Sequence, residues 1–186
     1  MNTKGSAFLA RRDLVIKDVG EARWEAFLRD FATREPVFGQ PILVSTKLPI
    51  EPFLALSDAI VATFYGGDVQ AHWRFGEASA EWAFSQGPYQ KYFRSNGFAA
   101  FIDATPMLWM AYYDAGKLTA TWHEEHAYAE LQILELPVMH VHFEFNVMAF
   151  ARRGLELTGG KVREVRPLRG VNTRSAEIHY QFYMES

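Results

Sequence analysis

Histidines and acidic residues at close spacing are the side chains of this sequence that could hold a metal or move a proton. The tetrad His123-Glu124-Glu125-His126 places two histidines three residues apart. A helical zinc-protease motif needs its histidines four apart, so that both approach the metal from one side of the helix. Because the flanking residues alternate as in a β-hairpin, we expect an exposed turn here and no zinc site.

His140 and His142 form a second close pair. The two side chains would share one face of a strand, whereas in a helix of about 3.6 residues per turn they diverge by roughly 200°. A helix would instead bring His140 close to Glu144, one turn further on, as an ion pair or hydrogen-bonded pair. We expect no metal site in this segment or elsewhere in the chain.

Other chemistries lack the residues or the spacing that they require. The sequence contains no cysteine, which excludes disulfides, thiol catalysis, thiolate-ligated haem and iron-sulfur clusters. No spacing singles out an acid-base pair or a nucleophile. The glycine pairs Gly66-Gly67 and Gly159-Gly160 do not form phosphate-cradling loops. We therefore expect no catalytic residue and a protein that is not an enzyme.

The remaining constellation is aromatic and surrounds the stretch WMAYYDAGKL, Trp109 to Leu118. Aromatic side chains at such a place form either a dense core or a pocket in which phenolic hydroxyls orient a ligand. The sequence leaves both interpretations open. The candidate ligand-binding residues are Phe101, Trp109, Tyr112, Tyr113, Trp122 and His142.

The chain length and the N-terminal residues predict one globular domain without a signal peptide. The chain has 186 residues, enough for one sizeable core, so we expect a single domain over residues 1–186. The apolar run before Arg11 and Arg12 is too short for a signal peptide, and no apolar run approaches the ~20 residues of a membrane span. We expect a cytoplasmic protein without a membrane span.

Charge is unevenly distributed along the chain. Residues 152–174 carry seven basic and two acidic residues, a local balance of +5 in a chain of net charge −3. Such a segment is either an anionic contact surface or a solvated polar face. A pI near 6.1 and the lack of a recognisable motif argue against nucleic-acid binding, so we expect no nucleic-acid partner.

Apolar spacing predicts helices in the first two-thirds of the chain. The expected helices are residues 6–19, a second from about Trp24 to Phe31, a third from Glu51 to Gly66-Gly67, and a fourth from Asp68 toward Gly87-Pro88 that continues from Tyr89 to Gly97. A last helix, residues 98–115, should be interrupted at Thr105-Pro106 and closed by Gly116. The breaker-rich residues 36–52 are interpreted as an ordered connector.

From Lys117 the apolar period changes to two, which is typical of strands. The alternation predicts a hairpin over residues 117–123 and 127–136, and two more strands over 161–168 and 175–184. Residues 138–158 are ambiguous, because their first part alternates as a strand does while the tail NVMAFARRGLELTGG is typical of a helix with a glycine stop. The whole pattern predicts an α+β fold.

Four stretches carry a resemblance to a known family: KGSAFLARRDLVIKDVG, LVSTKLPIEPFLALSDAIVATFYGGD, WMAYYDAGKL and RGVNTRSAEIHYQF. In order and spacing they resemble the superfamily of ligand-binding domains that includes haem nitric-oxide sensors, 4-vinyl-reductase-type effector domains and core subunits of the TRAPP tethering complex. Within it, the chain is most similar to a paralogous group described from myxobacteria. The stretches cover nearly the whole chain.

The resemblance implies a helical N-terminal part packed on a four-stranded antiparallel sheet, with a long helix between the two strand pairs. On this ground we adopt a helix over residues 138–158. Relatives carry cysteines near the loop before the last strand, where residues 169–174 contain no sulfur. Haem sensors pair a proximal histidine with a tyrosine-serine-arginine triplet that this chain lacks, so we expect no cofactor.

These observations favour a non-enzymatic sensory or ligand-binding domain. The expected ligand is a small hydrophobic or amphipathic molecule held between the helices and the sheet, and the expected output is a signalling protein partner. We also expect a homodimer. The alternative is a TRAPP-like homodimeric interaction or scaffold protein in which the pocket is vestigial.

Overall fold

Three helices follow one another at the N-terminus of the computed structural model, which describes residues 1–85 and 90–185, and the side chains of residues 1–85 and 97–185. Helix α1 spans Gly5–Val19, α2 spans Glu21–Ala32 and α3 spans Ile50–Phe64, which confirms the three predicted helices. Gly20 separates α1 from α2 with a φ of 88°, in the left-handed region that favours glycine. This residue ends the first helix as predicted.

The breaker-rich connector contains more structure than we expected. A 3₁₀ turn spans Pro36–Gly39, and β2, Lys47–Pro49, pairs antiparallel with β1, Asn2–Lys4. Strands of three residues are too short to show a period, so no local pattern predicted this sheet. Thr3 of β1 also bridges to Tyr113, which ties the start of the chain to the end of the helical part.

Two further helices form the middle of the molecule. Helix α4 spans Ala71–Ser85, and α5 spans Gln90–Tyr112 with a kink at Gly97, where φ is 71°. The predicted interruption at Thr105-Pro106 is wrong, since α5 continues through Pro106. The predicted boundary at Gly87-Pro88 and the start at Tyr89 lie outside the described residues.

The ambiguous segment is helical, as the resemblance implied. A π-helical turn spans His142–Asn146 and leads directly into α6, Val147–Leu157. The helix begins later than predicted, because residues 138–140 are irregular. The side chain of His140 accepts a hydrogen bond from the backbone N–H of His142 at 3.0 Å and so satisfies one free donor at the helix start.

The second half of the chain builds one antiparallel sheet. Its strands are β3 (Lys117–His123), β4 (Tyr128–Leu134), β5 (Val162–Arg169) and β6 (Ile178–Met184), in the order β3-β4-β6-β5. Strands β4 and β6 alternate buried and partly buried residues along their lengths. The α+β fold is therefore confirmed, with the π turn and α6 lying in the chain between the two strand pairs.

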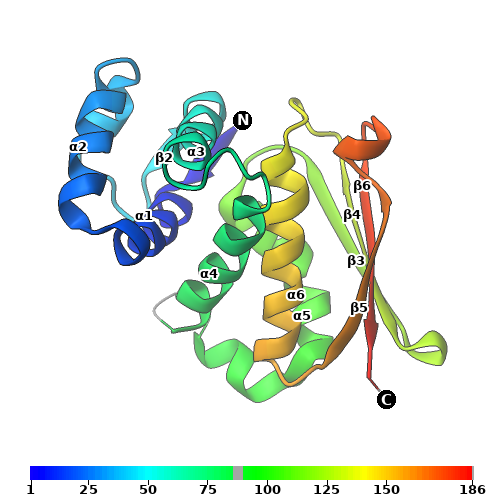
Figure 1. Ribbon diagram of the computed structural model, residues 1–186. Helices are drawn as coiled ribbons and strands as arrows, with labels where there is room; N and C mark the ends of the chain where they lie inside the picture. Colours follow the sequence, from blue (N-terminus) through cyan, green and yellow to red (C-terminus); the bar gives the residue numbers. More distant parts are fainter. Residues whose placement is uncertain (86–89, 186) are drawn as a thin grey trace.

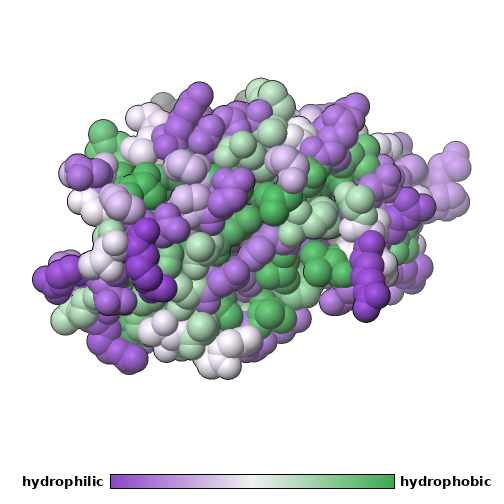
Figure 2. Space-filling model, turned by 90° about the horizontal axis from the view of Figure 1, so that it is seen from above, coloured by the Kyte–Doolittle hydropathy of each residue, from purple (hydrophilic) through white to green (hydrophobic). Residues whose placement is uncertain are grey.

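The elements form layers (Figure 1). Helices α4, α5 and α6 lie between the four-stranded sheet and the N-terminal helices α1 to α3. Helices α4 and α6 approach closely, because an added Cβ at Gly76 would lie only 2.7 Å from the Cβ of Ala149. Seen from above, the surface intersperses polar and apolar residues (Figure 2). Among the described residues, no helix is long and apolar enough to cross a membrane.

Candidate functional site

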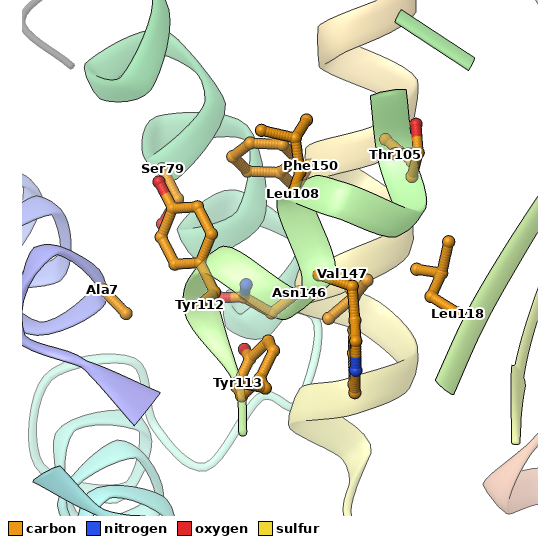
Figure 3. A pocket seen from close by; sticks show the side chains of 12 residues that line it. Ala7, Ser79, Thr105, Leu108, Tyr112, Tyr113, Leu118, Asn146, Val147 and Phe150 are labelled. Carbon is orange, nitrogen blue, oxygen red and sulfur yellow. The ribbon is translucent and has the colours of Figure 1, made fainter. Parts of the chain in front are cut away.

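A small pocket lies where α1, α4, α5, α6 and β3 meet (Figure 3). Its volume is about 50 Å³, and most of its lining is apolar. A buried water occupies about 10–15 Å³ on this measure, so the pocket has room for a molecule of only a few non-hydrogen atoms. The lining residues are Ala7, Ser79, Thr105, Leu108, Trp109, Tyr112, Tyr113, Leu118, Asn146, Val147, Phe150 and Ala151.

The structure brings three of the six candidate residues together at this pocket: Trp109, Tyr112 and Tyr113. The rings of Trp109 and Tyr113 pack with centroids 4.5 Å apart. Phe101 lies in the core instead, 1% exposed and 5.9 Å from the ring of Phe84. Trp122 packs against Phe98 at 5.3 Å and does not line the pocket.

The sixth candidate, His142, belongs to a buried polar group that we call the arginine cluster: Arg11, Ser57, Tyr113, His142 and Asn146. The Arg11 guanidinium donates to the Ser57 hydroxyl, to Oδ1 of Asn146 at 2.9 Å and toward Nδ1 of His142 at 3.3 Å. Arg11 is 2% exposed. The cluster therefore joins α1 and α3 to the π turn through hydrogen bonds.

Two aromatic rings complete the surroundings of Arg11. Its guanidinium carbon lies 4.7 Å from the ring centroids of both Phe53 and Phe75. Within the described part of the chain, no carboxylate is within ion-pair distance of Arg11, and its Nε has no partner. Burial lowers the pKa of Arg11 to about 10, so the side chain keeps its charge at neutral pH.

The hydrogen bonds of Arg11 fix the tautomer of His142. Because arginine can only donate, Nδ1 of His142 accepts, and Nε2 carries the proton and donates to the Tyr113 hydroxyl at 2.9 Å. Burial, reinforced by the charge of Arg11, holds the pKa of His142 well below its usual range. His142 is therefore a neutral core histidine with a hydrogen bond on each ring nitrogen.

His140 and His72 lie beside the arginine cluster and face Asp58 on α3. Nε2 of His140 is 3.0 Å from Asp58, and Nε2 of His72 is 3.7 Å from the other carboxylate oxygen. The predicted pairing of His140 with Glu144 is therefore wrong. The π turn directs Glu144 to the opposite side, where its carboxylate accepts from the Tyr180 hydroxyl at 2.7 Å and from the backbone N–H of Val171 at 2.6 Å.

A second, larger hollow lies on that opposite side, between the start of α4, the π turn and the loop from β5 to β6. We call it the π-turn groove, and its volume is about 500 Å³. Its lining includes Glu144, which is buried. The lining residues are Gln70, Trp73, Glu144, Phe145, Val165, Pro167, Leu168, Arg169, Gly170, Asn172, Thr173 and Tyr180.

The structure also locates the tetrad around residues 124–126 and the basic segment 152–174. Residues 124–126 form an exposed 3₁₀ turn between β3 and β4, and no group of three metal-ligating side chains was found where side chains are described. Much of the +5 segment is engaged in ion pairs, as Arg152 and Arg153 both pair with Glu156, Arg166 with Glu164, and Arg169 with Glu177. These pairs favour the interpretation of a solvated polar face.

Sequence reasoning missed Arg11, Asn146 and Ser57 as site residues. Arg11 stood in the sequence only as the charge that ends a short apolar run. A signal was present, since Arg11 lies four residues after Ala7 and four before Val15 on the buried stripe of α1. That position predicts burial, but the partners of Arg11 come from residues 46 and 135 positions away.

Comparison with solved structures identifies the fold. No known protein-family model and no curated protein matches the sequence. An H-NOX protein from S. oneidensis in the Fe(II)NO ligation state matches with a TM-score of 0.78 at 10% identity, covering 98% of this chain and 99% of that chain. An oxygen-binding H-NOX domain related to soluble guanylate cyclases matches with a TM-score of 0.72 at 11% identity, covering 98% and 95%.

The chain therefore has the H-NOX fold. An NMR structure of an H-NOX domain from Shewanella oneidensis in the Fe(II)CO state agrees, with a TM-score of 0.69 at 13% identity over 98% of this chain and 99% of that chain. The broader part of the predicted resemblance, a fold shared with haem nitric-oxide sensors, is confirmed.

Haem, which studies of the H-NOX family describe, does not fit the residues present in this chain. Pockets for ligands of that size have volumes of about 300–1,000 Å³, whereas the pocket at Trp109 has about 50 Å³. His142 engages both ring nitrogens in hydrogen bonds. No histidine lines either the pocket or the π-turn groove in the described part of the chain.

Proposed function

We propose that this protein is a non-enzymatic sensory domain that binds a small hydrophobic or amphipathic molecule in the pocket at Trp109, Tyr112 and Tyr113. The observation that supports this proposal is that two lining residues, Tyr113 and Asn146, also belong to the arginine cluster. A ligand that displaces either side chain changes the hydrogen bonds of Arg11 and His142. Those bonds hold α1 and α3 against the π turn, so occupancy is passed to the N-terminal helices.

The size and chemistry of the pocket set the class of ligand. A volume of about 50 Å³ and a largely apolar lining favour a compact, weakly polar molecule, or the narrow end of a longer amphipathic one. Thr105 and Ser79 use their hydroxyls to bond helix carbonyls one turn earlier. The hydroxyls of Tyr112 and Tyr113 and the side-chain amide of Asn146 therefore supply the polar contacts.

Xenon is a suitable probe, because it enters apolar cavities without needing a polar partner. Under xenon pressure, we expect backbone amide resonances of residues 105–118 and 147–151 to shift. Ala151→Leu should abolish these shifts by filling the pocket, whereas Ala99→Leu, an exposed position on α5, should leave them unchanged. Absence of shifts in the unmodified protein, or their survival in Ala151→Leu, would refute the pocket.

Native mass spectrometry of the purified protein tests for a retained natural ligand. Tyr112→Phe and Trp109→Ala should both weaken its uptake. Loss of the Trp109 ring also removes core contacts and should reduce the free energy of unfolding by about 3–5 kcal/mol. If both variants lose stability while uptake survives, these aromatic residues pack in the core and do not bind the ligand.

We also propose that the domain is cytoplasmic, acts on a signalling partner and forms a homodimer. Met107 and Met110, 56% and 67% exposed on α5, offer an apolar contact surface. Light scattering of the purified protein should give the mass of two chains, and Met110→Lys should give the mass of one. The scaffold alternative is less favoured, because the structural matches reported above are to H-NOX domains.

A further inference from the structure

We infer that the π-turn groove is a second binding site, which takes a small organic ammonium ion against Glu144. The groove lies across the π turn from the arginine cluster and shares no lining residue with the pocket at Trp109. This inference is independent of the proposed function. Its volume of about 500 Å³ is within the range of sites for small molecules.

The first observation is a buried carboxylate without a cation. Glu144 is 2% exposed and accepts one hydrogen bond on each oxygen, from Tyr180 and from Val171. Both donors are neutral, and no arginine, lysine or histidine among the described side chains forms an ion pair with Glu144. A carboxylate has about four acceptor positions, so two remain. A buried negative charge of this kind is stabilised by a cation.

The second observation is the aromatic lining around that carboxylate. Trp73, Phe145 and Tyr180 come from α4, the π turn and β6 and line the same groove. Aromatic faces attract alkylated ammonium groups through the ring quadrupole, and they provide apolar surface for the attached methyl groups. A buried carboxylate among aromatic rings is the combination that recognises such cations.

The basic residue at the groove does not reverse this preference. Arg169 is half-exposed at the rim and pairs with Glu177 at 2.6 Å, so its charge is balanced by a carboxylate outside the groove. The loop also fits closely over the acid, because any side chain at Gly170 would collide with the carboxylate of Glu144. Among the described side chains, the groove therefore contains one buried acid without a cationic partner, Glu144, whereas the charge of Arg169 is balanced by Glu177.

Choline and its neutral isostere 3,3-dimethylbutan-1-ol are the matched probes. Each is titrated into the protein while the indole N–H resonance of Trp73 is followed; Trp73→Phe assigns that resonance by its loss. We expect saturable shifts with choline and at least about tenfold weaker binding of the isostere. Glu144→Gln should weaken choline binding by a similar factor, and Glu35→Gln, an acidic residue outside the groove, should not change it.

A second variant keeps the proposal testable if Glu144→Gln fails to fold. Trp73→Leu changes a partly buried side chain at the groove and leaves the carboxylate in place, and it should also weaken choline binding, followed by backbone amide shifts of residues 144 and 171. Equal binding of the two probes would mean an apolar groove that ignores charge. That result, preferential binding of propionate at Arg169, or no saturable shift with choline would each overturn the inference.

Discussion

The hydroxyl of Tyr113 lies 2.9 Å from Nε2 of His142, although the two residues are 29 positions apart; Tyr113 directly follows α5, and His142 begins the π turn. The opposite nitrogen of the same imidazole faces Arg11 at 3.3 Å. One histidine thus connects the aromatic junction to a buried guanidinium. Tyr113 also lines the pocket, so this contact joins the proposed ligand site to the polar centre of the molecule.

Tyr113→Phe removes the acceptor of the His142 Nε2 proton while keeping the ring. A buried donor left without a partner costs about 1–3 kcal/mol, so we expect the free energy of unfolding to fall by that amount. Urea denaturation measures it. Tyr128→Phe, at a partly exposed position beside the hairpin turn, should change stability by less than about 0.5 kcal/mol. An equal effect of the two substitutions would contradict the role of Tyr113.

Arg11→Lys keeps the charge but loses the planar guanidinium. An ammonium cannot lie between Phe53 and Phe75 and also reach Ser57 and Asn146, so the acceptors lose their partner. We expect a loss of about 2–4 kcal/mol in the free energy of unfolding, because buried hydrogen bonds to a charged group contribute about 1.5–3 kcal/mol each. The neighbouring Arg12→Lys serves as control, because Arg12 is half-exposed and pairs with the adjacent Asp13. If Arg11→Lys left the free energy of unfolding unchanged, the positive charge alone would be sufficient.

Stability should fall as the solution is acidified from pH 7 to pH 5. Burial lowers the pKa of His72 to about 3 and that of His142 well below 6.5, so both stay neutral in the folded protein. In the unfolded chain they bind protons below about pH 6.5. Acid therefore favours the unfolded state, by about 2 kcal/mol for each histidine across this interval.

The pH effect is assigned to these residues by substitution. Stability attributable to them is fully present above about pH 7.5 and is lost as the pH falls through 6.5, the ordinary histidine pKa. In His72→Asn we expect the loss between pH 7 and pH 5 to be roughly half as large, measured by urea denaturation at each pH. A profile that is flat in the unmodified protein would disprove the neutral, buried state of both side chains.

Gly76→Ala should destabilise the protein, although alanine is the better helix former. Propensity alone predicts a gain of about 1 kcal/mol. The added methyl group would collide with the carbonyl of Asn146 and lie 2.7 Å from Cβ of Ala149, so α4 and α6 would have to separate. We expect a net loss of about 1–3 kcal/mol by thermal or urea unfolding. Gly39→Ala is the matched control, because a Cβ at this position would lie 3.7 Å from Cβ of Ala32, an ordinary contact distance. This substitution should leave the free energy of unfolding nearly unchanged.

Local pattern was sufficient for most elements of this fold. The strand Lys117–His123 and the helices around Leu14, Trp24 and Leu56 follow from apolar spacing of two or of three and four residues, because each element buries one continuous face. The sequence alone also excluded cysteine chemistry. It identified the aromatic junction, and three of those aromatic residues line one pocket.

Tertiary structure decided what local pattern could not. Residues 141–147 alternate as in a strand, yet they are helical, because the π turn buries His142 and Asn146 against Arg11 and Glu144 against Tyr180. Both of its sides are thus in the interior, which removes the contrast that a sequence pattern records. The three-residue strands β1 and β2 exist only through their mutual pairing.

The chemistry of the site depends on the same distinction. The sequence determined which charged groups exist, but burial and partners across 131 positions made His142 neutral and left Arg11 and Glu144 without an ion-pair partner among the described side chains. Charge and pKa are properties of surroundings that only the fold assembles. Residue types and periods therefore determined most of the elements, whereas long-range packing determined the π turn, the short strands and which elements meet at the two sites.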